Sequence, residues 1–113
     1  MPVSLYKKFS IPPAVKVGFM TYNIEFVRDL RDTQHNRLFG QQDYTNSRIS
    51  LDDSTTSADQ VHNTVLHEVM HAVWKMMELP HEPEEDYVSR LTNGLHTVFQ
   101  ENPKLVDMFK KGK

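Results

Sequence analysis

The sequence feature that most constrains the fold is one long amphipathic helix that begins near the middle of the chain. Ser57 and Gln60 have the three-residue spacing of a capping box, so the helix is predicted to begin after Ser57. It continues to about Leu79, because the residue before Pro80 disfavours helical geometry. Apolar residues at steps of three and four form one face for burial, which predicts the central helix of a domain. This face contains Val61, Val65, Val69, Ala72, Val73 and Met76, with Leu66 and Met70 at its border.

The segment before this helix predicts a small sheet. Apolar and polar residues alternate over residues 15–27, which predicts one long strand or two short ones. Residues 28–37 are polar and predict a loop. Residues 38–44 and 48–52 flank an Asn/Ser turn, which predicts a β-hairpin. Within the first of these strands, Gly40 marks a bulge or a close approach of backbone.

Two further helices are predicted near the C-terminus. The first begins at Pro83, which suits a first helical turn, and ends near Asn102. Asn102 and Pro103 then fit the start of a short helix, so residues 104–113 are expected to form this helix and a basic tail. The buried stripe of the longer helix is expected to contain Val88, Leu91, Leu95, Val98 and Phe99.

The length bounds the class of protein. With 113 residues, the chain is expected to be a single domain, residues 1–113, too short for a dinucleotide-fold enzyme or a kinase. Residues 1–14 are expected to be irregular, because Pro12 and Pro13 interrupt regular structure. Strands followed by helices predict an α+β fold.

Composition and charge limit the ligands and partners. Cys is absent, so His, Asp and Glu must hold any metal. A net charge of -2 without a basic stripe argues against nucleic acid as a partner. No segment approaches the roughly 20 apolar residues of a membrane span. The N-terminus lacks a secretory apolar region, so we expect a cytoplasmic protein with no membrane partner.

The strongest chemical signal is the HExxH motif formed by residues 67–71 of the predicted helix. Side chains four positions apart are neighbours on a helix, so His67 and His71 are placed to bind one zinc ion. Glu68 lies about 100° around the helix axis and is placed to accept a proton from a zinc-activated water. The alternative is that both imidazoles belong to the solvated face of an amphipathic helix, together with Thr64, Lys75 and Glu78.

Catalytic zinc sites usually have three protein ligands and one open position, so a third ligand is needed. Trp74 and Met77 stand where a metzincin would have Gly and His, which excludes that class. Glu78 is two turns from His71 and too far along the helix axis. An acid in the first turn of an antiparallel second helix would face the two His residues, and spacing leaves Glu84 and Glu85 both open. The other candidates are His81, Glu82, Asp86 and His96.

These residues resemble the small zincin-like metallopeptidases of the gluzincin type, related to the ImmA/IrrE group and common in phage and prophage genomes. The resemblance covers roughly residues 20–105. Thirteen residues separate His71 from Glu85, fewer than in many relatives. The matching segments are residues 22–27, 39–40, 49–51, 66–72, 85–91, 94–95 and 101–103.

The resemblance implies a zincin-like minimal fold, with a small, mainly antiparallel sheet packed on the HExxH helix and a second helix beyond it. It favours Glu85, followed by Val88 three positions on, as the third zinc ligand, with Glu84 in reserve. It also implies that a sheet edge, the strand of 38–44 or that of 48–52, runs along the cleft and receives substrate by strand addition.

The expected function is therefore zinc-dependent hydrolysis of a peptide or protein substrate. Zn²⁺ would be held by His67, His71 and Glu85, with Glu68 as general base. The alternative is a regulatory or interaction protein that keeps the zincin fold with a structural metal or none and does not cleave. A donor for the oxyanion is expected from among Tyr44, His81, Tyr87 and His96.

Overall fold

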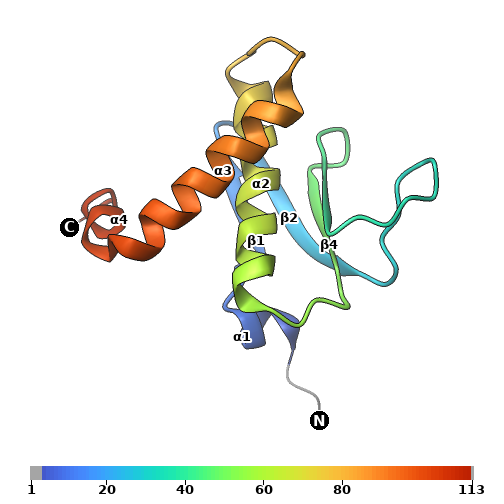
Figure 1. Cartoon of the computed structure of the whole chain (residues 1–113), viewed down its shortest axis with the longest axis horizontal. Helices are drawn as coiled ribbons and strands as arrows, with labels where there is room; N and C mark the ends of the chain where they lie inside the picture. The colour runs from blue at the N-terminus through green and yellow to red at the C-terminus, as the bar shows by residue number, and fades with distance from the viewer. Residues whose placement is uncertain (1–3, 113) are drawn as a thin grey trace.

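The computed structural model describes residues 4–112, which form a four-stranded sheet and four helices (Figure 1). The first half of the chain supplies the strands and the second half the three longer helices, so the fold class is α+β, as predicted. The elements are α1 (Leu5–Phe9), β1 (Ala14–Val17), β2 (Met20–Val27), β3 (Gly40–Asp43), β4 (Arg48–Asp52), α2 (Ala58–Met76), α3 (Glu84–Glu101) and α4 (Pro103–Met108).

The sheet has the strand order β1-β2-β4-β3 and is mixed. The hairpins β1–β2 and β3–β4 are antiparallel, whereas β2 and β4 pair in parallel between them. The alternation over residues 15–27 thus becomes two short strands, one of the two predicted outcomes. The hairpin predicted from residues 38–44 and 48–52 is also confirmed, and its first strand, β3, lies at an edge of the sheet.

The core lies between the sheet and α2. Ile49 and Leu51 of the central strand β4 are fully buried, and Val61 and Ala72 of α2 are buried in the same cluster. The predicted apolar face of α2 is confirmed along most of its length, because Val65, Val69 and Val73 also pack against this cluster. The helix ends at Met76 and not near Leu79, and Met76 itself is exposed.

The N-terminal segment is more regular than predicted. Residues 1–3 lie outside the described residues, but α1 forms within the segment expected to be irregular, with Ser4 as its N-cap. Long-range contacts hold this five-residue helix: the Tyr6 hydroxyl donates to the carbonyl of Ile24 at 2.6 Å, and the carbonyl of Phe9 lies 2.5 Å from His62 Nε2. Such contacts leave no periodic signal in so short a helix.

The polar loop before β3 is fixed by a buried carboxylate. Asp52, at the end of β4, accepts hydrogen bonds from the Leu30 N–H at 2.8 Å and from Arg37 at 3.1 Å. Burial alone would raise the pKa of Asp52, but hydrogen bonds from Ser54 and Leu30 and the charge of Arg37 hold it below the usual value. The loop is thereby held against the sheet end from which β3 starts.

The predicted buried stripe of α3 is correct only near its start. Val88 and Thr92 are fully buried against α2, but Leu91, Val98 and Phe99 are exposed. Figure 1 shows the reason: α3 crosses α2 with its first half and then projects beyond it, carrying α4 at its end. The short helix begins at Pro103, as predicted. None of the helices in residues 4–112 combines the length and the apolar character that a membrane crossing requires.

The close approach predicted at Gly40 is present, and it leads to a stability prediction. A Cβ at Gly40 would lie 2.5 Å from the Thr64 methyl group, which is fixed because the Thr64 hydroxyl donates to the Gln60 carbonyl at 2.9 Å. Gly40→Ala should lower the free energy of unfolding in urea by about 1–3 kcal/mol.

Gly94 supplies the matched control, since a Cβ there meets nothing within 4 Å. Gly94→Ala, inside α3, should raise the free energy of unfolding by about 0.5–1 kcal/mol. Removing the methyl group with Thr64→Ala should recover part of the stability lost in Gly40→Ala. Equal effects of the two Gly→Ala changes would contradict the tight contact between β3 and α2.

Candidate metal centre

The two His residues of the HExxH motif lie together on α2. The helix begins where the Ser57 side chain accepts from the Gln60 N–H at 3.2 Å, and its regular geometry places His67 and His71 one turn apart. Their Nε2 atoms are 3.1 Å apart. Both side chains are largely buried, 21% and 16% exposed, so they do not belong to the solvated face of the helix.

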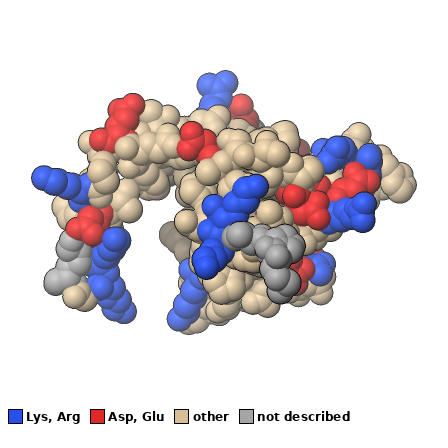
Figure 2. Space-filling view, turned by 90° about the horizontal axis from the view of Figure 1, so that it is seen from below, with Lys and Arg blue, Asp and Glu red and all other residues tan. Residues whose placement is uncertain are grey.

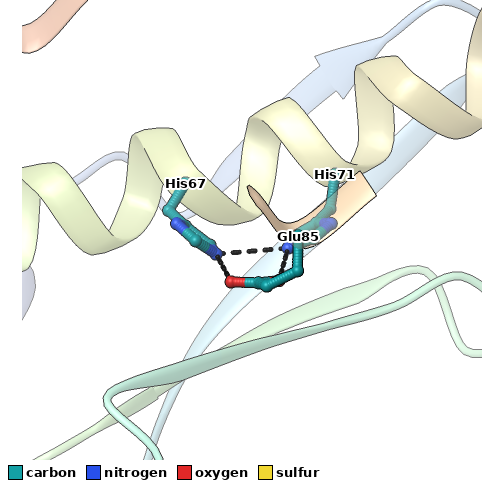
Figure 3. A group of neighbouring side chains, drawn as sticks. All are labelled: His67, His71 and Glu85. Carbon is teal, nitrogen blue, oxygen red and sulfur yellow. Dashed lines mark hydrogen bonds and ion pairs between the residues drawn. The ribbon is translucent and has the colours of Figure 1, made fainter. Parts of the chain in front are cut away.

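Glu85 reaches the same point from the first turn of α3. Its Oε1 lies 2.9 Å from His67 Nε2, and its Oε2 lies 2.8 Å from His71 Nε2 (Figure 3). The Glu85 side chain is 69% exposed, so it closes the group from the solvent side. Two imidazole nitrogens and one carboxylate therefore point toward one another, and within the described residues they form a group able to hold a metal ion.

Glu84, the other candidate from the sequence, contacts the opposite nitrogen of His71. Its Oε2 lies 2.6 Å from His71 Nδ1, on the far side of the ring from Glu85. A carboxylate only accepts hydrogen bonds, so Nδ1 carries the hydrogen and Nε2 presents its lone pair to the group. Glu84 thus orients His71 and does not join the three donor atoms.

The donor set fits zinc in chemistry and in size. Two His and one carboxylate form a known ligand set of catalytic zinc. With zinc–ligand bonds of 2.0–2.1 Å in tetrahedral geometry, neighbouring ligand atoms stand about 3.3 Å apart. The observed contacts between donors, 2.8 to 3.1 Å, are a few tenths of an ångström shorter. Small side-chain movements would admit the ion.

Glu68 lies under this group and is 7% exposed. Burial raises its pKa to about 7, and the charge of Glu85 adds to the rise. Two effects oppose it: the positive charge that His71 carries when it is protonated, and a hydrogen bond that the Gln42 N–H of β3 donates to the carboxylate. A carboxyl group with a raised pKa of this kind is typical of a general acid or base.

The edge strand β3 borders the same site. A cavity of about 370 Å³ is lined by Gly40, Gln41 and Gln42 of β3 together with His67, Glu68, His71 and Glu85. The Phe39 carbonyl accepts from the Asp52 N–H, and backbone groups alternate along an antiparallel strand. The backbone groups of Gly40 and Gln42 therefore point away from β4. Of the two strands that the sequence left open as the cleft edge, β3 is at the edge and β4 is central.

The remaining candidates from the sequence do not join the group. Asp86 pairs with Arg90 at 3.1 Å, and the His96 ring lies 3.0 Å from Asn63 Nδ2. Tyr87 stacks on Trp74, with ring centroids 6.0 Å apart, and so packs outside the cavity. Glu78, His81 and Glu82 are exposed on the turn between α2 and α3. A second cavity, about 310 Å³, adjoins the site and includes Arg37 and Asn63, which the sequence did not single out because neither belongs to a motif.

Comparisons of the chain with protein-family models, with curated proteins and with solved structures return no match. Any functional conclusion therefore depends on the chemistry of the residues themselves.

The contact between Glu84 and His71 leads to a prediction about metal affinity. Glu84→Gln weakens the hydrogen bond that fixes the imidazole, so zinc affinity should fall about 10- to 100-fold. Glu85→Gln should lower it further, because a donor is lost. Affinity is measured by competition with a chromophoric chelator.

Glu82→Gln is the matched control, because it removes the same charge from an exposed position two residues from Glu84. Its zinc affinity should equal that of the wild type. If Glu84→Gln and Glu82→Gln bind zinc equally well, Glu84 has no orienting role.

Proposed function

We propose that the chain is a zinc-dependent metallopeptidase with a zincin-like fold of the gluzincin type, in which His67, His71 and Glu85 hold the ion. The observation that carries this proposal is the convergence of three metal-binding side chains on one cavity that also contains a buried carboxyl group, Glu68. A buried carboxyl group beside a metal group is the arrangement that general-base hydrolysis requires.

The charges in the site support the presence of a cation. Glu68, Glu84 and Glu85 surround two imidazoles, and desolvation lowers the pKa of His67, which favours its neutral form. Neutral imidazoles and carboxylates are ligands for a divalent ion. When bound, zinc supplies Lewis-acid polarisation of a peptide carbonyl and of water.

Glu68 supplies the proton transfers in this proposal. Its carboxylate accepts a proton from the attacking water and later donates that proton to the amine that leaves. Both steps need a group whose protonated and ionised forms are close in free energy. The hydrogen bond from the Gln42 N–H holds the carboxylate in place toward the cavity.

The substrate is proposed to be a peptide segment in extended conformation. The outward N–H and carbonyl of Gly40 and the outward carbonyl of Gln42 border the cavity, so a peptide placed along them would add a strand to the sheet. The Gln42 N–H stays with the Glu68 carboxylate. Such a pose would carry the scissile bond past His67 and Glu68. The adjoining cavity that contains Arg37 would then contact the side chains of the substrate and select among them.

A Glu68→Gln variant tests the proposal. It should retain about one zinc per chain, because Glu68 is not a ligand, and should lose at least about 100-fold in peptide hydrolysis, because general-base catalysis is worth that much. The zinc content is measured by elemental analysis. Peptide hydrolysis is measured with an unstructured protein such as casein as the substrate. Glu101→Gln, at an exposed position of α3, should match the wild type in both.

Two results would contradict the proposal in different ways. If the wild-type protein binds no zinc, the proposed metal site does not exist. A wild-type protein that binds zinc but cleaves no peptide in a diverse library is the non-catalytic protein that the sequence left as the alternative.

A further inference from the structure

Asn63 lies on α2 one helical turn before His67, on the same side of the helix. It lines the cavity of about 310 Å³ that adjoins the metal centre. The residues that this cavity shares with the cavity of the metal centre include Gly40 of β3, His67, Glu68 and Glu85. A peptide that lies along Gly40 and passes the metal group would therefore also pass Asn63.

The side-chain nitrogen of Asn63 is held by α3. It lies 3.1 Å from Asn93 Oδ1 and 3.0 Å from His96 Nδ1. An amide nitrogen carries two hydrogens and only donates, so both hydrogens are used here and His96 carries its own ring hydrogen on Nε2. Figure 2 shows, on the left, the gap that separates the end of α3 and α4 from the rest of the molecule beyond this contact. The two bonds fix the plane of the Asn63 amide where α3 leaves α2.

The side-chain oxygen of Asn63 has no such partner. Among residues 4–112, no group donates a hydrogen bond to Asn63 Oδ1. The atom is accessible, unlike the buried, unpartnered hydroxyl of Thr92. Because the nitrogen is turned toward α3, the oxygen is the polar atom that the amide offers to the cavity. A structural link between the two helices needs only the nitrogen, whereas a fixed and free acceptor suits a donor that a ligand brings.

β3 and Asn63 stand on different sides of the cavity. The methyl group of Thr64 lies against Gly40 of β3, and Asn63, one residue earlier, lies about 100° around the helix axis on the side of α3. The backbone groups of an extended peptide point alternately to its two sides. One side of a bound peptide would thus pair with β3 at Gly40, and its other side would face Asn63.

We propose that Asn63 Oδ1 accepts a hydrogen bond from a main-chain N–H of the peptide substrate, on the side of the peptide opposite β3. This inference rests on the proposed peptidase function and adds a substrate-binding residue outside the HExxH motif. The peptide is held on both sides, by the backbone of Gly40 and by the Asn63 amide. Asn93 and His96 act through Asn63 as positioning residues. Because the contact is with the main chain, it favours an extended peptide and does not select its side chains.

Asn63→Ala tests the contact from the side of the protein, with a casein peptide that the wild type cleaves as the substrate. Loss of one hydrogen bond should raise KM about 3- to 10-fold. The value of kcat should stay nearly unchanged, because an N–H away from the reacting bond is bound equally in the ground state and the transition state. Zinc content should remain that of the wild type. Asn23→Ala, exposed on the sheet face turned away from α2, is the matched control and should leave KM unchanged.

Ester substitution in the peptide then identifies the N–H that is bound. One backbone N–H at a time, other than that of the scissile bond, is replaced by an oxygen atom. One replacement should raise KM of the wild type about 3- to 10-fold and have little further effect in Asn63→Ala, because its acceptor is already gone. Replacement of an N–H that bonds to β3 should have the same effect in both proteins. If Asn63→Ala binds less zinc than the wild type, Asn63→Leu takes its place, since it keeps the volume of the side chain.

The role of Asn63 is overturned if every ester replacement acts equally on the variant and on the wild type. It is also overturned if Asn63→Ala and Asn23→Ala have the same KM. Both results leave the peptidase function intact, because the wild type still cleaves the peptide. A wild type that cleaves no casein peptide contradicts the proposed function itself, and the Asn63 contact falls with it.

Discussion

The close packing of α2 on the edge strand β3 is the constraint on which the rest of the structure depends. Gly40 has no side chain, so the Thr64 methyl group occupies the space of a Cβ. One turn further along α2, Glu68 accepts a hydrogen bond from the same strand at Gln42. A buried carboxyl group needs such a partner, because burial of an unpaired polar group costs free energy. These two contacts hold the helix in the rotation that turns its His residues toward the cavity.

The first turn of α3 completes the group of metal-binding side chains near the C-terminal end of α2. It brings Glu84 and Glu85 to the two nitrogens of one imidazole, and Val88 and Thr92 anchor that turn in the core. Beyond this contact α3 leaves α2, so its later apolar residues do not join the core. One crossing geometry thus accounts both for the group of three donor side chains and for the exposure of the later apolar residues of α3.

The features that could be predicted from the sequence are those with local signals. The period of α2, its Ser57 cap and the turn between β3 and β4 are of this kind. The spacing of apolar residues in α3 does not show how far α3 stays in contact with α2. The exposure of Phe99, which lies beyond the buried part of that contact, could therefore not be predicted. A shift of one residue turns a helical side chain by about 100°, so only the placement of α3 decides that Glu84 meets Nδ1 and Glu85 meets Nε2 of His71.

We propose that His67, His71 and Glu85 together bind one zinc ion. Zinc-edge X-ray absorption of the zinc-loaded wild-type chain tests it most directly, because imidazole ligands give a distinct outer-shell scattering pattern. We expect two imidazole nitrogens and carboxylate or water oxygens at about 2.0–2.2 Å from the zinc. A shell of oxygens alone, or one with three imidazoles, would contradict the ligand set proposed from the geometry.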